Sequence, residues 1–271
     1  MPILSGPRLN QPAWFDLSTT DLAAAKSFYG ELFGWTFHDG GEALGHYTQA
    51  HRQGHAAAAI VPKMPGMEQT PTVWTVYFGV ADAGQTAADI AAQGGSVMVP
   101  PMDVMGLGTM AVAVDPEGAV FGLWQAGTFP GAGIEGEPGS MCWAEVNTRR
   151  PSDAVAFYGG LFSLAAHRME NADREYHTLH LPAGDAVAGV FGMTPDMAHI
   201  PPHWMPYFVV ESIAHAQAVM ARHGATVLYG PAPTPHGDML LLRDAQGGFC
   251  AVLSAERGGG TTERRQLNDD S

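Results

Sequence analysis

Cysteine is scarce in this chain. Its 271 residues include only two cysteines, Cys142 and Cys250, and both lie in apolar, strand-like surroundings. A free thiol in such surroundings behaves as a small hydrophobic side chain. No Cys-x-x-Cys pair and no cysteine–histidine spacing typical of a zinc site is present. We therefore expect two reduced thiols in the core and a fold that needs neither a disulfide nor a structural zinc ion.

Positive charge is also scarce. Thirteen lysines and arginines against 27 aspartates and glutamates give a formal net charge of −14, which disfavours phosphate backbones and anionic membrane surfaces. No apolar run is long enough to span a bilayer, and residues 1–11 lack the pattern of a secretory signal. No glycine-rich motif stands where a nucleotide site needs one. We expect a cytoplasmic protein with no nucleic-acid or membrane partner.

What the sequence does contain is a repeat. Trp-Phe-Asp-Leu at 14–17 matches Trp-Ala-Glu-Val at 143–146, and Phe-Tyr-Gly at 28–30 recurs at 157–159. The match extends to the end of each copy, where Asp-Pro-Glu-Gly at 115–118 corresponds to Asp-Ala-Gln-Gly at 244–247. A whole domain has been duplicated. We predict two domains with one core each, at 10–127 and 139–256, joined by a Gly/Pro-rich linker at 128–138 and followed by a mobile tail at 257–271.

Each copy shows the same order of elements twice. Alternating apolar residues at 14–19 predict a strand, and the apolar spacing at 21–33 predicts a helix that Asp21 caps and Gly34 ends. In the second copy, Ser152 or Asp153 is expected to cap a helix that ends at Phe162. A second strand–helix–strand series follows in each copy, with a hairpin turn at 115–118. The chain therefore contains four βαβββ modules.

These elements, with Phe-Tyr-Gly in the helix and Asp-Pro-Glu-Gly before the last strand, resemble the vicinal-oxygen-chelate superfamily. That superfamily includes glyoxalase I, bleomycin-resistance proteins and extradiol dioxygenases, and the likeness is greatest to its tandem two-domain, glyoxalase-like members. The resemblance implies an α+β fold in which the four modules form two cup-shaped mixed sheets. It also implies a small-molecule ligand and a divalent metal, held by a residue on the first strand of each module and a Glu on the last.

The metal ligands of the family are mostly missing here. Asp16 and Glu145 match the first-strand position by residue type, but the other positions carry poor ligands or no ligand: Thr75 and Met205 replace the His, and Gly122 and Ala251 replace the Glu. A catalytic metal usually needs about three protein ligands. We therefore predict no cofactor and no metal site, although the family makes a divalent metal conceivable.

Strand alternation places Trp14, Asp16 and Ser18 in the first cup, and Trp143, Glu145 and Asn147 in the second. A carboxylate surrounded by aromatic rings suits an apolar or aromatic ligand that carries a polar or cationic group. We predict Asp16 and Glu145 as catalytic candidates, and as ligand-binding residues Trp14, Tyr47, Thr75, Tyr77, Trp124, Trp143, Tyr176, Met205 and Tyr207. Trp74 and Trp204 are expected to pack in the core. His203 and His236 are either ligand contacts or surface residues.

Three functional hypotheses follow. In the first, each cup binds a small organic molecule without metal, as in a sequestering, resistance-type or sensor protein. In the second, the protein is a glyoxalase-like lyase or isomerase, or a hydroxylase-like enzyme, in which Asp16 or Glu145 is a metal ligand or general base. In the third, one cup is filled by side chains, and the divergent second copy with its Met205 is the candidate. Each chain carries complete cups, so monomer and homodimer both stay open.

Overall fold

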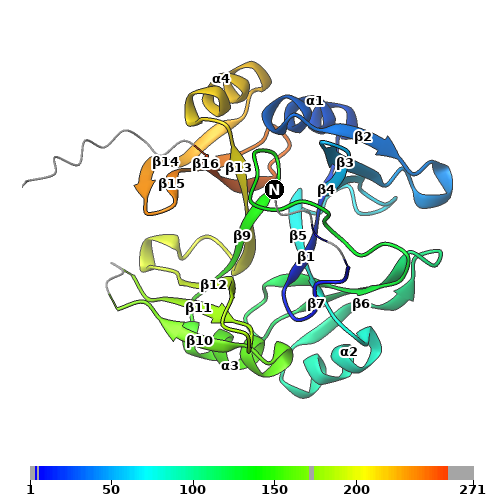
Figure 1. Ribbon diagram of the computed structural model, residues 1–271, viewed down its shortest axis with the longest axis vertical. Coiled ribbons are helices and arrows are strands. Elements are labelled where there is room, and N and C mark those ends of the chain that lie inside the picture. Colours follow the sequence, from blue (N-terminus) through cyan, green and yellow to red (C-terminus); the bar gives the residue numbers. More distant parts are fainter. Residues whose placement is uncertain (1–3, 5, 171–173, 256–271) are drawn as a thin grey trace, which may run out of the picture.

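Two eight-stranded mixed sheets form the framework of the protein (Figure 1). The computed structural model describes the chain apart from residues 1–3, 5, 171–173 and 256–271, so the predicted tail lies outside the described residues. The strand order is β2-β3-β4-β1-β5-β8-β7-β6 in sheet one and β10-β11-β12-β9-β13-β16-β15-β14 in sheet two. The predicted α+β fold with two duplicated sheets is confirmed.

Each sheet is built by one half of the chain in the predicted βαβββ order. The first half contains β1 (Pro12–Thr19), α1 (Leu22–Phe33), β2 (Thr36–Asp39), β3 (Thr48–Arg52), β4 (His55–Pro62), β5 (Val73–Gly79), α2 (Ala83–Ala92), β6 (Ser96–Asp103), β7 (Gly108–Val114) and β8 (Val120–Ala126). The second half contains β9 (Met141–Thr148), α3 (Pro151–Phe162), β10 (Ala165–Arg168), β11 (Tyr176–His180), β12 (Ala186–Gly192), β13 (His203–Val210), α4 (Ile213–His223), β14 (Thr226–Thr234), β15 (Gly237–Arg243) and β16 (Phe249–Ser254). Within the described residues, no helix is both long and apolar enough to cross a membrane.

The ends of the first helix follow the sequence signals. Asp21 caps α1 by accepting a hydrogen bond from the backbone N–H of Ala24 (2.9 Å), and Gly34 ends it with a positive φ of 65°. The predicted cap of α3 is wrong, because Ser152 and Asp153 lie inside the helix. Arg150 occupies the cap position without a side-chain cap bond of its own, and Pro151 begins the helix.

The two faces of each sheet differ. On β1, Phe15 and Leu17 point toward the helices and are fully buried, whereas Trp14 belongs to a separate cluster on the opposite face. This is the alternation expected of a strand with one face against a core. We call the face without helices the cup face. Trp74 and Trp204 lie on the helix side, in the core, as predicted.

The helix sides of both sheets share one hydrophobic core, so the expectation of a separate core for each domain is wrong. Phe208 of the second half contacts the rings of Trp35 and Trp74 in the first, at 5.8 and 5.1 Å between ring centroids. Phe78 of the first half stacks on Phe162 of the second at 4.3 Å. Helix α1 lies beside α4 and α2 beside α3 (Figure 1). Each half therefore completes the core of the other.

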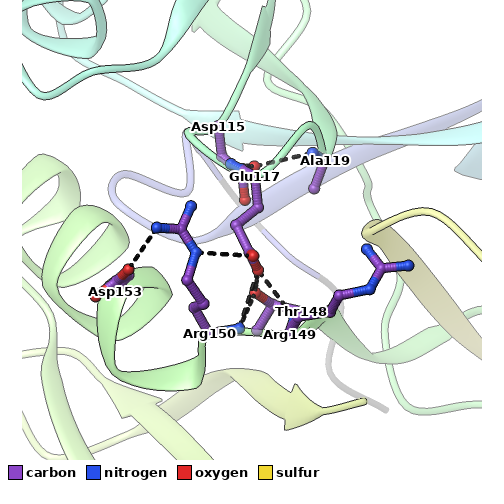
Figure 2. A network of polar contacts seen from close by, with 7 residues as sticks. All are labelled: Asp115, Glu117, Ala119, Thr148, Arg149, Arg150 and Asp153. Atoms are coloured by element: carbon purple, nitrogen blue, oxygen red, sulfur yellow. Dashed lines mark hydrogen bonds and ion pairs between the residues drawn. The ribbon is translucent and has the colours of Figure 1, made fainter. Parts of the chain in front are cut away.

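Polar contacts also join the halves. Tyr29 donates a hydrogen bond to Asp244 (2.8 Å), and in the symmetric pair Tyr158 donates to Asp115 (3.0 Å). Figure 2 shows a third contact, in which the carboxylate of Glu117 accepts from the backbone N–H groups of Arg149 and Arg150. The hydroxyl of Thr148 and Nε of Arg150 also donate to Glu117. Glu117 of the first half thus binds the two backbone N–H groups that directly precede α3.

Candidate functional site

A chain of hydrogen bonds leads to a buried carboxyl group on the cup face of sheet one. The indole Nε1 of Trp14 donates to the hydroxyl of Tyr47 (2.6 Å), which donates to Oδ2 of Asp16 (3.1 Å). Trp14 and Asp16 share a face because they are two residues apart on β1, and Tyr77 on β5 pairs with Trp14 in register. These residues, with Trp124 on β8, form what we call cup one.

Burial determines the acidity of Asp16. Its side chain is 6% exposed, and the loss of hydration raises its pKa from 3.8 to about 6, although hydrogen bonds from Tyr77 and Tyr47 oppose the shift. The carboxyl therefore exchanges a proton close to neutral pH. A group with such a pKa is suited either to accepting a proton or to binding a polar ligand group.

Sheet two repeats the arrangement with a glutamate. Nε1 of Trp143 donates to the hydroxyl of Tyr176 (2.8 Å), and Tyr176 donates to Oε2 of Glu145 (3.0 Å). Tyr207 donates to the other oxygen, Oε1, at 2.7 Å. Burial raises the pKa of Glu145, and the two tyrosines lower it in part. These four residues, together with Met205, which pairs with Glu145 across β9 and β13, form what we call cup two.

Residues 127–133, which we call the strap, cover the aromatic end of cup one. The ring of Phe129 meets that of Trp14 edge to face at 4.8 Å, and Trp124 Nε1 donates to the backbone oxygen of Phe129 (2.9 Å). Together with Val104, Leu107 and Met110, the strap leaves Trp14, Tyr77 and Trp124 only 3%, 7% and 7% exposed. The Gly/Pro-rich segment predicted as a plain linker is thus, in its first part, a packed element of the first half.

Cup two is more accessible than cup one. Glu145 is buried at 5% exposure, but Trp143 and Tyr207 are only partly buried, whereas their counterparts Trp14 and Tyr77 are buried; Tyr176 and its counterpart Tyr47 are both partly buried. Among the described residues, none is placed over Trp143 as Phe129 is placed over Trp14. The hypothesis that the second copy is the filled one is therefore not supported. In the structure, the aromatic end of the first copy is the covered one.

The residues around neither carboxyl fit a divalent metal. Gly122 faces the Tyr77 ring so closely that a Cβ there would lie 2.0 Å from Cδ1 of Tyr77, so that ring occupies the space of a ligand side chain. At the matching position of sheet two, Ala251 pairs with Tyr207. Across the described part of the chain, no three His, Cys, Asp or Glu side chains gather where they could hold a metal ion. One carboxylate per cup falls short of the donor set that a catalytic metal needs.

The remaining candidates fall into two groups. Thr75 is half-buried on the cup face opposite Asp16, and His203 lies opposite Asn147 in the same way. His236 is exposed near the start of β15. The predicted set of ligand-binding residues omitted Asn147, although strand alternation places it in cup two; it is 2% exposed, and its side chain lowers the pKa of Glu145. It also missed Phe129, whose one sequence signal is that no other aromatic residue occurs between 127 and 140.

Comparisons with known proteins agree with this architecture. Residues 11–123 match the profile of the glyoxalase/bleomycin resistance protein/dioxygenase superfamily. The chain is 39% identical to the putative glyoxylase CFP32 of Mycobacterium tuberculosis, over 93% of this chain and 98% of that protein. It is 36% identical to the anthracycline biosynthesis protein DnrV of Streptomyces peucetius, over 91% and 94%.

Solved structures show the same fold at low sequence identity. The Mn(II)-bound glyoxalase from Novosphingobium aromaticivorans superposes with a TM-score of 0.62 at 14% identity, covering 91% of this chain and 82% of that one. The 2,3-dioxygenase LapB from Pseudomonas sp. KL28 gives 0.61 at 15% identity, covering 92% and 93%. Likeness at this level of identity concerns the fold alone.

Proposed function

The chain belongs to the glyoxalase/bleomycin resistance protein/dioxygenase superfamily, and we propose that it binds a small organic molecule on the cup face of sheet two, beside Glu145. The observation that carries the proposal is the contrast between the buried carboxyl of Glu145 and the partly exposed rings around it. Apolar walls with a few fixed polar groups are typical of small-molecule sites. Tyr176 and Tyr207 hold the carboxyl in place before any ligand arrives.

The side chains of cup two favour an aromatic ligand that carries oxygen or nitrogen substituents. The faces and edges of Trp143 and Tyr207 suit ring contacts. The hydroxyl of Tyr207 can accept a hydrogen bond from a ligand donor while it donates to Glu145. The name of the relative from Streptomyces peucetius, an anthracycline biosynthesis protein, supports a ligand of this class.

Binding in this proposal needs no metal. Met205 and Gly189 pair with Glu145 across the sheet, and Ala251 pairs with Tyr207; none of these three offers a hard oxygen or imidazole ligand. We expect addition of Mn²⁺ or Zn²⁺, or treatment with a chelator, to leave ligand affinity unchanged. A stoichiometric divalent ion that is lost in Glu145→Gln would contradict this part of the proposal.

Calorimetric titration tests the site. Suitable probes are 2-naphthol and 1,4-dihydroxyanthraquinone, which carry hydroxyl groups on fused aromatic rings. We expect Trp143→Phe and Tyr207→Phe each to weaken binding on the order of 10-fold, the usual effect of losing one hydrogen bond or ring contact. The matched control is Asp16→Asn in cup one, which should leave affinity unchanged. Unchanged affinity in Trp143→Phe, or no binding by the wild-type chain, would contradict the proposal.

A second candidate function is catalysis by the same superfamily chemistry, with Glu145 or Asp16 as a general base. The raised pKa values of both carboxyls support it, since a base works best near the operating pH. The relative named putative glyoxylase makes a glyoxalase-type assay the first choice. Activity that falls at least 100-fold in Glu145→Gln, and persists in Asp16→Asn, would assign the base to cup two. Activity that is absent, or equal in both variants and the wild type, would rule out this candidate.

A further inference from the structure

Cup one contains an aromatic ring supplied by the chain itself. Phe129 places its ring edge to face against Trp14 at 4.8 Å and also contacts Trp124 at 6.0 Å between centroids. The backbone carbonyl oxygen of Phe129 accepts a hydrogen bond from Trp124 Nε1. An aromatic ring beside a hydrogen-bonded carbonyl is the kind of group that a small aromatic ligand would present to these side chains.

The strap is fixed at both ends, so the position of Phe129 does not depend on its own ring alone. The backbone N–H of Phe129 donates to the oxygen of Leu107 (3.0 Å), and the N–H of Ala132 donates to that of Ala13 (2.8 Å). Between them Gly131 has a φ of 106°, and a Cβ there would lie 2.5 Å from the oxygen of Ala13. Only glycine fits this conformation and this close approach to β1. The strap is therefore a built part of the fold.

Cup two has no counterpart of this ring among the described residues. Trp143 stands where Trp14 does, but Leu253 takes the place of Trp124, and Trp143 is partly exposed. By sequence, the strap corresponds to the residues that follow β16, which read Glu-Arg-Gly-Gly-Gly-Thr-Thr and include no aromatic residue. The two cups thus share the Trp–Tyr–carboxyl chain and differ in the ring laid over it.

We propose that Phe129 is a built-in occupant of cup one, and that beneath it lies a second site for an aromatic ring, which the chain keeps closed. The inference rests on the proposed function in one respect: it takes cup two as an open site that binds the same class of aromatic ligand. The chain consequently has two duplicated cups but binds one aromatic ligand. Removing the ring of Phe129 while keeping the rest of the strap opens the second site.

The test is the number of 2-naphthol molecules bound per chain, measured by calorimetric titration of the wild type, Phe129→Ala and the control Phe37→Ala. Phe37 is also a half-buried phenylalanine, but it lies on β2 beside Trp35, away from either cup. We expect one molecule per chain for the wild type and Phe37→Ala, and two for Phe129→Ala. If the wild type binds one molecule, one for Phe129→Ala overturns the inference, and a wild type that binds two molecules overturns it as well.

The outcomes separate this inference from the proposed function. If the wild type binds no 2-naphthol and Phe129→Ala binds one, cup two is not the site and the closed site in cup one stands. If neither binds, both proposals fail.

A second measurement does not depend on the folding of Phe129→Ala. In the otherwise wild-type chain, Trp143→Phe should weaken binding of 2-naphthol about 10-fold, while Trp14→Phe should leave it unchanged. Equal weakening by Trp14→Phe means that cup one is already open, which overturns the inference.

Discussion

Tyr158 of the second half donates a hydrogen bond to Asp115 of the first, 3.0 Å away, and the same pair recurs with the halves exchanged as Tyr29 and Asp244. Each tyrosine lies in a helix and each aspartate in the turn before the last strand of the other sheet. Both aspartates are nearly fully buried. The duplicated Phe-Tyr-Gly and Asp-x-x-Gly motifs therefore hold the two halves together.

Loss of either hydroxyl should destabilise the whole chain. We expect Tyr158→Phe and Tyr29→Phe each to lower the free energy of unfolding by about 1–2 kcal/mol, because a buried carboxyl oxygen loses its partner. Urea unfolding measures the change. Tyr229→Phe, which removes an exposed hydroxyl from β14, is the control and should have no effect. Two separate unfolding transitions in either variant, in place of one weaker transition, would show that the shared core is not cooperative.

Glu117 gives a second prediction, since it stabilises the start of a helix in the other half (Figure 2). We expect Glu117→Ala to cost about 1–2 kcal/mol, the usual range for loss of hydrogen bonds to a charged acceptor. Gln246 occupies the corresponding turn position in the second half, so Gln246→Ala is the matched control and should cost less. Equal unfolding midpoints for the two variants would mean that the contacts of Glu117 with Arg149 and Arg150 do not stabilise the protein.

The parts of this structure that local patterns determine were predictable. The alternation on β1 separated Phe15 from Trp14 correctly, because a strand places successive side chains on opposite faces. The caps at Asp21 and Gly34 were found for the same reason: each depends on contacts within a few residues. The duplicated aromatics around Asp16 and Glu145 could be matched by comparing one copy with the other.

What the sequence did not indicate depends on contacts between distant segments. The role of Glu117 at α3 is invisible in the helix sequence, where Ser152 and Asp153 are better cap formers than Arg150. The shared core arises because the helix sides of both sheets meet, which no pattern within one copy encodes. Phe129 stands in a segment whose composition is that of a linker, and its contact with Trp14 spans more than a hundred residues of sequence.

Gly122 provides a third prediction, which concerns the space next to Asp16. A Cβ at this position would lie 2.0 Å from the Tyr77 ring, so Gly122→Ala must displace a tyrosine that hydrogen-bonds to Asp16. We expect a loss of about 1–3 kcal/mol in the free energy of unfolding, as for other insertions into a packed site. Gly84→Ala in α2, where a Cβ meets no atom closer than 3.3 Å, should be neutral or stabilising. A neutral Gly122→Ala would mean that Tyr77 moves freely.

The raised pKa of Asp16 predicts how stability depends on pH. Burial raises its pKa from 3.8 to about 6 in the folded chain, so between these values the folded state binds more protons than the unfolded state. Stability from this group is therefore present at low pH and is lost as pH rises to about 6, by up to about 3 kcal/mol. Asp16→Asn cannot titrate, so the unfolding free energy of the wild type minus that of the variant should fall between pH 4 and pH 7. Glu117→Gln should show the opposite slope at lower pH: although burial opposes it, hydrogen bonds from Thr148 and Arg150 hold the pKa of Glu117 below 4.5, so the stability from this group is present above pH 4.5 and is lost as pH falls below that value. A wild-type minus Asp16→Asn difference that is flat with pH would mean that the carboxyl of Asp16 is hydrated in the folded protein.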